Sequence, residues 1–347
     1  MQRRDDMAQD IQKGNKPKTI DVHAHMIALG GPETEEKYRD VMPYISRDAA
    51  GRELIAVKGK APFLLPEYLY KPERRIEEMD RINVEIQVLS TMAPLAGYDL
   101  DPQLGLGYSR IQNNAIAKVV KAHPKRFVGL ATVPLQEPYE AAKELERAMK
   151  DLGMKGVEIA TDVNGRNLDW RALWPFYAKA QELGAFILVH PGTPPAMGQM
   201  QDYCLHNLIG YPFITSLAIG SLIFGGVLED FPKLKFCFAH AGGFAPYQRG
   251  RMEHGYKVKA ECRGKISKPP SEYFKLLHFD TITHYIPALE YLIKTAGIDN
   301  VLLGSDYPFD VADSDPVETV NRLNISNAEK KKIWGENAVK LLGISTD

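Results

Sequence analysis

The chain has 347 residues, of which 44% are hydrophobic and 25% are charged, with 28 glycines and 23 prolines. This composition is typical of a soluble globular protein and gives no support to a collagen, a coiled coil or a disordered chain. The 43 basic and 44 acidic side chains leave a net charge of −1. We therefore expect no bulk field that would attract nucleic acid or an anionic membrane.

The cysteines and the apolar stretches indicate the compartment. Cys204, Cys237 and Cys262 are too few and too scattered for a disulfide scaffold. The N-terminal segment 1–16 is polar, so it is expected to be flexible and is not a secretory signal. The longest apolar stretch, Phe213–Leu228, is interrupted by glycines and is shorter than the ~20 residues that a membrane span needs. We expect a reduced, cytoplasmic protein that contacts no membrane.

Eight short apolar runs recur along the chain. They are rich in β-branched residues and nearly continuous, which is typical of strands that are buried on both faces. The runs are Thr19–His25, Val84–Thr91, Phe127–Val133, Gly156–Thr161, Phe186–His190, Lys235–His240, His278–Thr283 and Val301–Asp306.

Helical patterns separate these runs, and the clearest are Pro72–Asn83, Glu137–Leu152, Trp170–Leu183 and Pro287–Ala296. Alternating strand and helix units predict a parallel sheet with right-handed crossovers. Eight such units predict an α/β fold of the (β/α)8 TIM-barrel type, with an open doubly wound sheet as the alternative. The sequence has neither a GxGxxG after the first strand nor a P-loop, and this removes the commonest reason to choose the open sheet.

Two segments depart from the plain alternation. An insertion of about 45 residues, 26–71, follows the first strand and is too long for an ordinary connection. We expect it to form a small subdomain or a lid over the mouth of the barrel. An extra C-terminal helix is predicted over Asn327–Leu342. The chain is thus expected to be one barrel domain, 17–347, behind the flexible N-terminus.

Residues that can bind a metal ion recur at the predicted strand ends. His23 and His25 are two positions apart on the first strand, so both imidazoles point to the same face. His190, His240 and Asp306 close three further runs. Because the C-terminal ends of barrel strands open on one face, these five side chains are expected to converge there. The alternative is that each is an ordinary polar residue that caps its own strand.

Imidazole and carboxylate groups are the ligands expected for a catalytic divalent ion, most often Zn²⁺, with Mn²⁺ also possible. Such an ion lowers the pKa of water and polarises substrate oxygens. A tetrahedral site with one open position needs fewer than five side chains. One histidine therefore remains as a candidate general acid or base.

Four segments resemble the motifs of the decarboxylase branch of the amidohydrolase superfamily, the branch that includes 2-amino-3-carboxymuconate 6-semialdehyde decarboxylase. They are His23-Ala-His25, Leu188-Val-His190-Pro191, Phe238-Ala-His240-Ala-Gly-Gly243 and Leu303-Gly-Ser-Asp306-Tyr-Pro-Phe309. The resemblance implies a metal-dependent carboxy-lyase that acts on a small unsaturated or aromatic carboxylic acid. It implies one divalent ion, commonly zinc, with His23, His25, His190 and Asp306 as ligands and His240 as the base that does not bind the ion.

The resemblance also implies an oligomer. Arg251 matches a family arginine that reaches into the neighbouring subunit's site and binds a substrate carboxylate, so a homodimer or higher homo-oligomer is expected. His284 follows a predicted strand and is expected on the catalytic face, where it contacts substrate. Phe309 follows Asp306 and is expected to line the pocket. The fourth strand carries Glu158 and lacks the bridging lysine of the hydrolytic branches, which agrees with a mononuclear site.

Three positions depart from the family pattern. Pro66 stands where the semialdehyde decarboxylase has a second substrate-binding arginine, and Gly192 and Asn207 stand where it has tryptophans. These departures predict a differently shaped pocket that favours a hydroxylated aromatic or ring-cleavage acid, unless Arg52, Lys58 or Lys60 restores the missing charge. Two other functions stay open. One is a hydratase or hydrolase of a ring-cleavage product, and the other is a binding or sensor protein on an inactive barrel.

Overall fold

The computed structural model describes residues 18–30, 34–57, 62–64, 69–192 and 197–345. The predicted N-terminal segment 1–16 lies outside these residues, and so do Lys58, Lys60 and Pro66.

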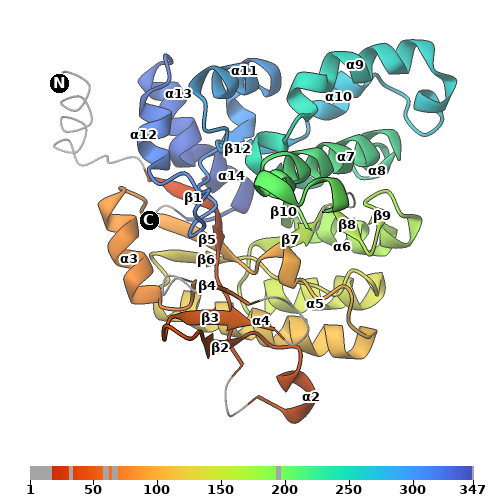
Figure 1. Ribbon diagram of the computed structural model, residues 1–347. Coiled ribbons are helices and arrows are strands. Elements are labelled where there is room, and N and C mark those ends of the chain that lie inside the picture. Colours follow the sequence, from red (N-terminus) through yellow and green to blue (C-terminus); the bar gives the residue numbers. More distant parts are fainter. Residues whose placement is uncertain (1–17, 31–33, 58–61, 65–68, 193–196, 346–347) are drawn as a thin grey trace.

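Parallel strands in two sheets form the centre of the described chain (Figure 1). One sheet has the order β1-β5-β6 and the other has the order β13-β12-β11-β10-β7. Each of the eight predicted runs contains one of these strands, and the α/β class with parallel pairing is confirmed. The strands are β1 (Ile20–His25), β5 (Ile86–Ser90), β6 (Phe127–Gly129), β7 (Gly156–Ala160), β10 (Phe186–His190), β11 (Lys235–Phe238), β12 (His278–Asp280) and β13 (Val301–Leu302).

Backbone hydrogen bonds join the outer strands of the two sheets on both sides. The amide of Ala131, just after β6, donates to the carbonyl of Gly156 on β7 over 2.8 Å. On the other side, the amide of Val22 on β1 donates to the carbonyl of Leu303 over 2.9 Å, and the amide of Asp306 donates to the carbonyl of His23 over 2.9 Å. The hydrogen bond from Asp306 to His23 places the loop after β13 directly beside the end of β1.

Several strands are shorter than the apolar runs that predict them. The runs to His240 and Asp306 do not continue as strands, because β11 ends at Phe238 and β13 ends at Leu302. The backbone of His240 has φ 53° and that of Asp306 has φ 64°, both in the left-handed region. A strand cannot pass through such angles. Both side chains are therefore presented by loops that leave the sheet.

Helices follow the strands, and most of them have proline at their first or second position, as expected for the first turn of a helix. Their predicted bounds agree with the structure to within about two residues, except that Trp170–Leu183 is divided into a short 3-10 turn, Arg171–Leu173, and α6. The helices are α3 (Pro72–Arg81), α4 (Pro102–Ala122), α5 (Pro138–Lys150), α6 (Trp174–Leu183), α7 (Tyr211–Phe224), α8 (Val227–Asp230), α9 (Ala245–Val258), α10 (Pro270–Phe274), α11 (Ile286–Ala296) and α12 (Pro316–Asn321).

Strand β10 shows how the core is divided. Phe186 and Leu188 pack in one buried apolar cluster, whereas Ile187 and Val189 pack in another. All four are fully buried. The period-two alternation places His190 on the same face as Phe186 and Leu188, and His190 is where that face reaches the C-terminal end of the strand.

The insertion after β1 contains a small antiparallel sheet. Helix α2 (Glu36–Arg39) precedes the strands β2 (Tyr44–Arg47), β3 (Glu53–Ala56) and β4 (Phe63–Leu64), which pair in the order β2-β3-β4. In Figure 1 this sheet lies at the opposite end of the molecule from α9 and α10. Residues that flank it, Ile27 and Leu69, pack with Met92 and Leu95 from the loop after β5. The insertion is therefore packed against loops at the C-terminal ends of the strands.

One helical segment in the described part of the chain, Asp202–Phe224, is long and apolar enough to cross a membrane by length and composition alone. It is longer than the apolar stretch identified in the sequence because 3-10 and π turns, Asp202–Cys204 and His206–Gly210, precede α7. A core helix of a soluble protein can have the same length and apolar composition. Here Ile219, Leu222 and Ile223 are buried in the main apolar cluster.

The predicted C-terminal helix is present as a continuous helical segment. It consists of α13 (Asn327–Lys331), a π turn (Lys332–Glu336) and α14 (Asn337–Leu342). Ser326 and Glu329 form a capping box at its start. Within the π turn, a Cβ added to Gly335 would lie 2.2 Å from the carbonyl oxygen of Lys18. The close approach of this segment to the start of β1 therefore requires a glycine.

We predict that Gly335→Ala destabilises the protein by about 1–3 kcal/mol, because the added methyl group meets backbone that cannot move aside without shifting β1. The matched control is Gly220→Ala in α7, where the new Cβ has open space. That change is expected to be neutral or to stabilise by up to ~1 kcal/mol, because alanine has the higher helix propensity. Urea unfolding curves measure both, and equal effects of the two substitutions would contradict the prediction.

Candidate metal centre

Four buried side chains meet at the C-terminal ends of the strands. His23 and His25 come from β1, His190 from the end of β10, and Asp306 from the loop after β13. One potential ligand atom from each lies within 4.8 Å of all the others. The sequence predicted this convergence, and the structure brings all four together.

The distances within the cluster are those of groups that face a common point. The Nε2 atoms of His23 and His25 are 3.0 Å apart. Asp306 Oδ1 lies 3.0 Å from His25 Nε2 and 3.2 Å from His23 Nε2. His190 Nε2 is 3.7 Å from the same oxygen, is buried, and makes no hydrogen bond within the described chain. An orphaned ring nitrogen beside two imidazoles and a carboxylate fits one divalent metal ion.

The Nδ1 atom of each histidine faces an oxygen atom. His23 Nδ1 is 2.7 Å from Asp280 Oδ2, and His190 Nδ1 is 3.0 Å from the Pro191 carbonyl oxygen. His25 Nδ1 is 3.5 Å from Glu158 Oε2. The hydrogen-bonding partners of His23 and His190 orient their rings with Nε2 toward the cluster, whereas His25 Nδ1 makes no hydrogen bond within the described chain. Sequence reasoning missed Asp280, although a carboxylate at the end of the seventh strand was a visible signal.

Burial sets the protonation of the ligands. It lowers the pKa of His25 to about 4 and that of His190 well below its usual range, so both are neutral at pH 7. Burial also acts to lower the pKa of His23, but Asp306 and Asp280 outweigh it and raise this pKa well above its usual value. In the same way, burial acts to raise the pKa of Asp306, and His23 outweighs it and holds that pKa low. The carboxylate of Asp306 is thus anionic, as the binding of a cation requires.

A buried polar network lies beneath the cluster. Asp21 Oδ2 accepts hydrogen bonds from Ser305 Oγ over 2.6 Å and from Gln87 Nε2 over 3.0 Å. The fully buried Arg75 donates to Gln87 Oε1 over 3.0 Å and also to the carbonyl oxygen of His25. Burial raises the pKa of Asp21 to about 6. The network joins β1, β5, α3 and the loop that contains Asp306. It therefore holds the backbone that carries His25 and Asp306 in place.

His240 stands beside the four potential ligands, in a 3-10 turn after β11. Its Nε2 lies 3.2 Å from Asp306 Oδ2, whereas the potential ligand atoms of the cluster gather near Oδ1. The centroid of its ring is 5.3 Å from that of His190. His240 is half-buried and lines a cavity of about 300 Å³. It therefore faces the space that a substrate can enter.

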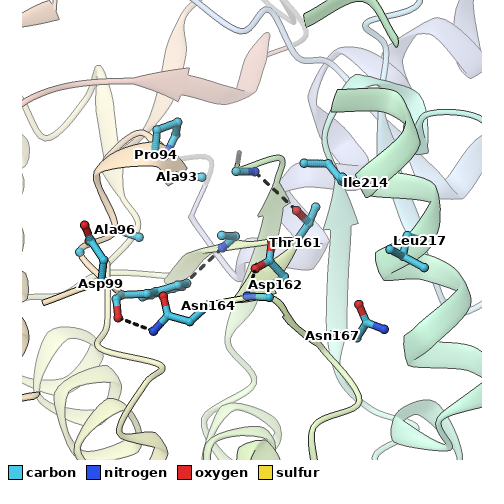
Figure 2. Close-up of a pocket in the computed structure, with 15 residues that line it drawn as sticks. Ala93, Pro94, Ala96, Asp99, Thr161, Asp162, Asn164, Asn167, Ile214 and Leu217 are labelled. Atoms are coloured by element: carbon cyan, nitrogen blue, oxygen red, sulfur yellow. Dashed lines mark hydrogen bonds between the residues drawn. The ribbon is translucent and has the colours of Figure 1, made fainter. Parts of the chain in front are cut away.

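Two cavities open near this cluster. The first, about 300 Å³, is lined by His240, Asp306 and the exposed His284, with mainly apolar walls from Tyr211, Pro212, Phe244, Ile282, Ala288 and Val311. No lysine or arginine of the described chain lines it. The second, about 460 Å³, lies between the loop after β5, the turn after β7 and α7 (Figure 2), with polar groups from Asp99, Asp162, Asn164 and Asn167. Gly192, directly after the His190-Pro191 motif, lines the second cavity.

The two remaining predicted residues occupy different surroundings. The ring centroid of Phe309 lies 5.4 Å from that of His25, and Phe309 also packs against the apolar cluster of the insertion. It borders the metal-ligand cluster but lines neither cavity described above. Arg251 is exposed on α9 and has no hydrogen bond or ion pair within the described chain. The structure thus does not bring Arg251 into the site of its own chain.

Comparison with known proteins identifies the family. Residues 20–344 match the family described as amidohydrolase. The chain belongs to this family. It is 36% identical over 329 residues to a 2-amino-3-carboxymuconate-6-semialdehyde decarboxylase from Dictyostelium discoideum, an alignment that covers 94% of this chain and 91% of that protein.

Two further proteins resemble this amidohydrolase. A 2-keto-4-carboxy-3-hexenedioate hydratase from Sphingobium is 29% identical over 271 residues, which is 72% of this chain and 74% of that protein. A crystal structure of a dihydroxybenzoic acid decarboxylase from Polaromonas, with bound manganese and the inhibitor 2-nitroresorcinol, matches with a TM-score of 0.77 at 24% identity. That match covers 94% of this chain and 97% of the other and shows that the two share a fold.

We predict that this amidohydrolase holds one divalent ion per chain and that Asp306→Ala removes it, because the change deletes a ligand atom and its charge together. Elemental analysis after dialysis against excess zinc or manganese measures the stoichiometry. Asp310→Ala is the control, since Asp310 lies in the same loop outside the cluster. Two ions per wild-type chain, or one ion retained by Asp306→Ala, would contradict the assignment.

Proposed function

We propose that this amidohydrolase is a metal-dependent decarboxylase, a carbon–carbon lyase that acts on a small unsaturated or aromatic carboxylic acid. The observation that carries the proposal is the position of His240, which shares Asp306 with the cluster of potential ligands and lines the cavity that opens on it. The similarity to the semialdehyde decarboxylase over nearly the whole chain supports the same activity.

The proposal includes a closed (β/α)8 barrel in a single domain, 17–347. The hydrogen bonds from Ala131 to β7, and those between β1 and the segment after β13, support closure because they link the outer strands of the two sheets on both sides. A cytoplasmic location agrees with the three free cysteines. The packing of the insertion against loops at the strand ends supports its role as a lid.

We assign His23, His25, His190 and Asp306 as the ligands of one zinc or manganese ion. When bound, the ion would supply a Lewis acid toward the oxygen atoms of substrate and water. The neutral imidazoles of His25 and His190 and the carboxylate of Asp306 are already in the protonation states that binding requires. The buried network around Asp21 and Arg75 keeps these side chains from relaxing away.

His240 is the group that handles the proton. Decarboxylation breaks the bond between the carboxyl carbon and its neighbour and leaves the electron pair on the neighbouring carbon, which must then gain a proton. His240 Nε2 faces Asp306 and the 300 Å³ cavity, so it can hold a proton at the edge of the reacting group and release it there. The apolar walls of that cavity limit water around the developing charge.

The cavity walls support a ring-shaped substrate. Tyr211, Pro212, Ile282 and Val311 present apolar surface on which an aromatic body can pack, and the exposed His284 offers a polar contact at the rim. Gly192 and Asn207 line the two cavities where the semialdehyde decarboxylase family has tryptophans, which leaves room for a bulkier body. Phe309, beside His25, covers the cluster on another side.

A homodimer or higher homo-oligomer completes the proposed site. The 300 Å³ cavity has no basic side chain from the described part of its own subunit, and a substrate carboxylate favours a cationic partner. Arg251 is exposed on α9 without a partner in the described chain. We assign it to the site of a neighbouring subunit, where its guanidinium binds that carboxylate.

A hydratase of a ring-cleavage product is the second candidate. The similarity to the 2-keto-4-carboxy-3-hexenedioate hydratase favours it specifically. The same ligand set and the same histidine can deliver water to a double bond as well as a proton to a carbon. Product masses distinguish the two reactions, because decarboxylation lowers the mass of the substrate by that of one CO2, whereas hydration raises it by that of one water.

The function is tested with a panel of acids that contains hydroxylated benzoates, the unsaturated semialdehyde and ring-cleavage products. We predict CO2 release from at least one, with phenolic acids better than the semialdehyde because of Gly192 and Asn207. His240→Ala is expected to keep its metal ion while kcat falls by roughly 10²–10⁴-fold, the usual contribution of a general acid or base.

Three outcomes would contradict this assignment. Water addition without CO2 release would favour the hydratase. A metal-free His240→Ala protein would make His240 a ligand. A semialdehyde kcat/KM of about 10⁴ M⁻¹s⁻¹ or more, with inert phenolic acids, would show that the pocket departures were misinterpreted.

We predict that Arg251 acts across the subunit interface. Arg251→Ala and His240→Ala homo-oligomers should each be nearly inactive, but mixed oligomers should regain activity because one site in a heterodimer has both intact groups. Differently tagged chains, co-expressed and purified through both tags, measure this. Arg263→Ala is the control, since Arg263 is bound to carbonyl groups of its own chain. Verified mixed oligomers without recovery would remove Arg251 from the neighbouring site.

A further inference from the structure

Asp280 connects two parts of the site that the proposed reaction uses separately. It is the last residue of β12, and its side chain is fully buried. Its Oδ2 lies 2.7 Å from His23 Nδ1 and 2.9 Å from the backbone nitrogen of His240. Its Oδ1 accepts from the backbone nitrogens of Ala241 over 2.7 Å and of Ile282 over 3.1 Å. Each oxygen therefore has two donors, and an ionised carboxylate can accept from all four.

The contact with His23 fixes a metal ligand. Because Nδ1 is hydrogen-bonded to Asp280, the other ring nitrogen, Nε2, is the atom that faces His25 and Asp306. A ring held in this way cannot flip or change its tautomer without breaking a buried, charge-assisted hydrogen bond.

The contacts with His240 and Ala241 fix the proposed base. Both residues have left-handed backbone, with φ of 53° and 56°. This conformation is unfavourable for residues other than glycine. Two hydrogen bonds from these backbone amides to one carboxylate offset that cost and hold the turn that presents the His240 imidazole to Asp306.

The packing around Asp280 is specific. A Cβ added to Gly304 would lie 2.7 Å from the Cβ of Asp280 and 3.3 Å from that of His23. The glycine in Leu303-Gly-Ser-Asp306 therefore leaves the space in which the Asp280 side chain reaches both partners.

We propose that Asp280 is a positioning residue that sets the metal ligand His23 and the base His240 from a single carboxylate. This inference rests on the proposed function for the role of His240. Glu158 provides the matched comparison: it also lies beside the Nδ1 atom of a proposed ligand, His25, at 3.5 Å, but its carboxyl oxygens make no hydrogen bond to the His240 turn within the described chain.

The test compares Asp280→Asn with Glu158→Gln. In either orientation of the new asparagine, its NH2 group would face two of the four donors, so both functions of Asp280 are impaired. Metal affinity, measured by chelator competition, is expected to fall by roughly 10–100-fold in both variants. With the metal site saturated, kcat is expected to fall about tenfold or more in Asp280→Asn with KM little changed, and to fall less in Glu158→Gln, which leaves the hydrogen bonds to the His240 turn intact.

A second measurement does not depend on turnover. Diethyl pyrocarbonate should modify His240 faster in Asp280→Asn than in the wild type or Glu158→Gln, as read by peptide mass spectrometry. Gly304→Ala, which displaces the Asp280 side chain without removing an acceptor, should show the same two effects and replaces Asp280→Asn if that variant does not fold.

Wild-type kcat and wild-type His240 reactivity in the metal-saturated Asp280→Asn and Gly304→Ala proteins would overturn the proposal. An equal loss of kcat in Glu158→Gln would also overturn it. If the wild-type enzyme releases CO2 from no acid, the proposed function fails, while metal affinity and His240 reactivity still decide the role of Asp280.

Discussion

The carboxylate of Asp306 is the contact on which the rest of the site depends. Its Oδ1 faces His25 Nε2 at 3.0 Å, and its Oδ2 faces His240 Nε2 at 3.2 Å. In the proposed function, this one residue lies between a metal-binding side and a proton-transfer side of the site. The left-handed backbone of Asp306 makes this possible, and the hydrogen bond from its amide to the carbonyl of His23 holds that backbone against the end of β1.

Buried carboxyl groups gather around the cluster and favour the binding of a cation. Asp21, Glu158, Asp280 and Asp306 are all buried near the three histidines, and Arg75 is the fully buried arginine beside them. Burial raises the pKa of Glu158 to about 8 and that of Asp21 to about 6, because each carboxylate has lost its solvation by water. A divalent ion would add positive charge that favours the ionised form of these buried carboxyl groups.

The sequence predicted the elements whose pattern is local. Strand β10 has the predicted bounds because its apolar run and its period are visible in consecutive residues, and the His23-Ala-His25 spacing predicted two side chains on one face. The partners of those histidines could not be predicted in this way. Asp280 and Glu158 are distant in sequence and meet β1 only because the sheets bring them there. The turn at His240 was read as a strand end, since apolar patterning does not reveal a left-handed φ.

Phe309 gives the insertion a mechanical connection to the metal ligands. Its ring lies beside His25, it packs against the apolar cluster that contains Ile55 of the insertion, and it follows Asp306 by three residues. A shift of the insertion cluster would therefore act on the Phe309 ring and, through it, on His25. Access of a substrate to the site and the positions of the side chains in the cluster are then coupled through Phe309. Substitutions in the insertion can therefore alter turnover without touching the substrate.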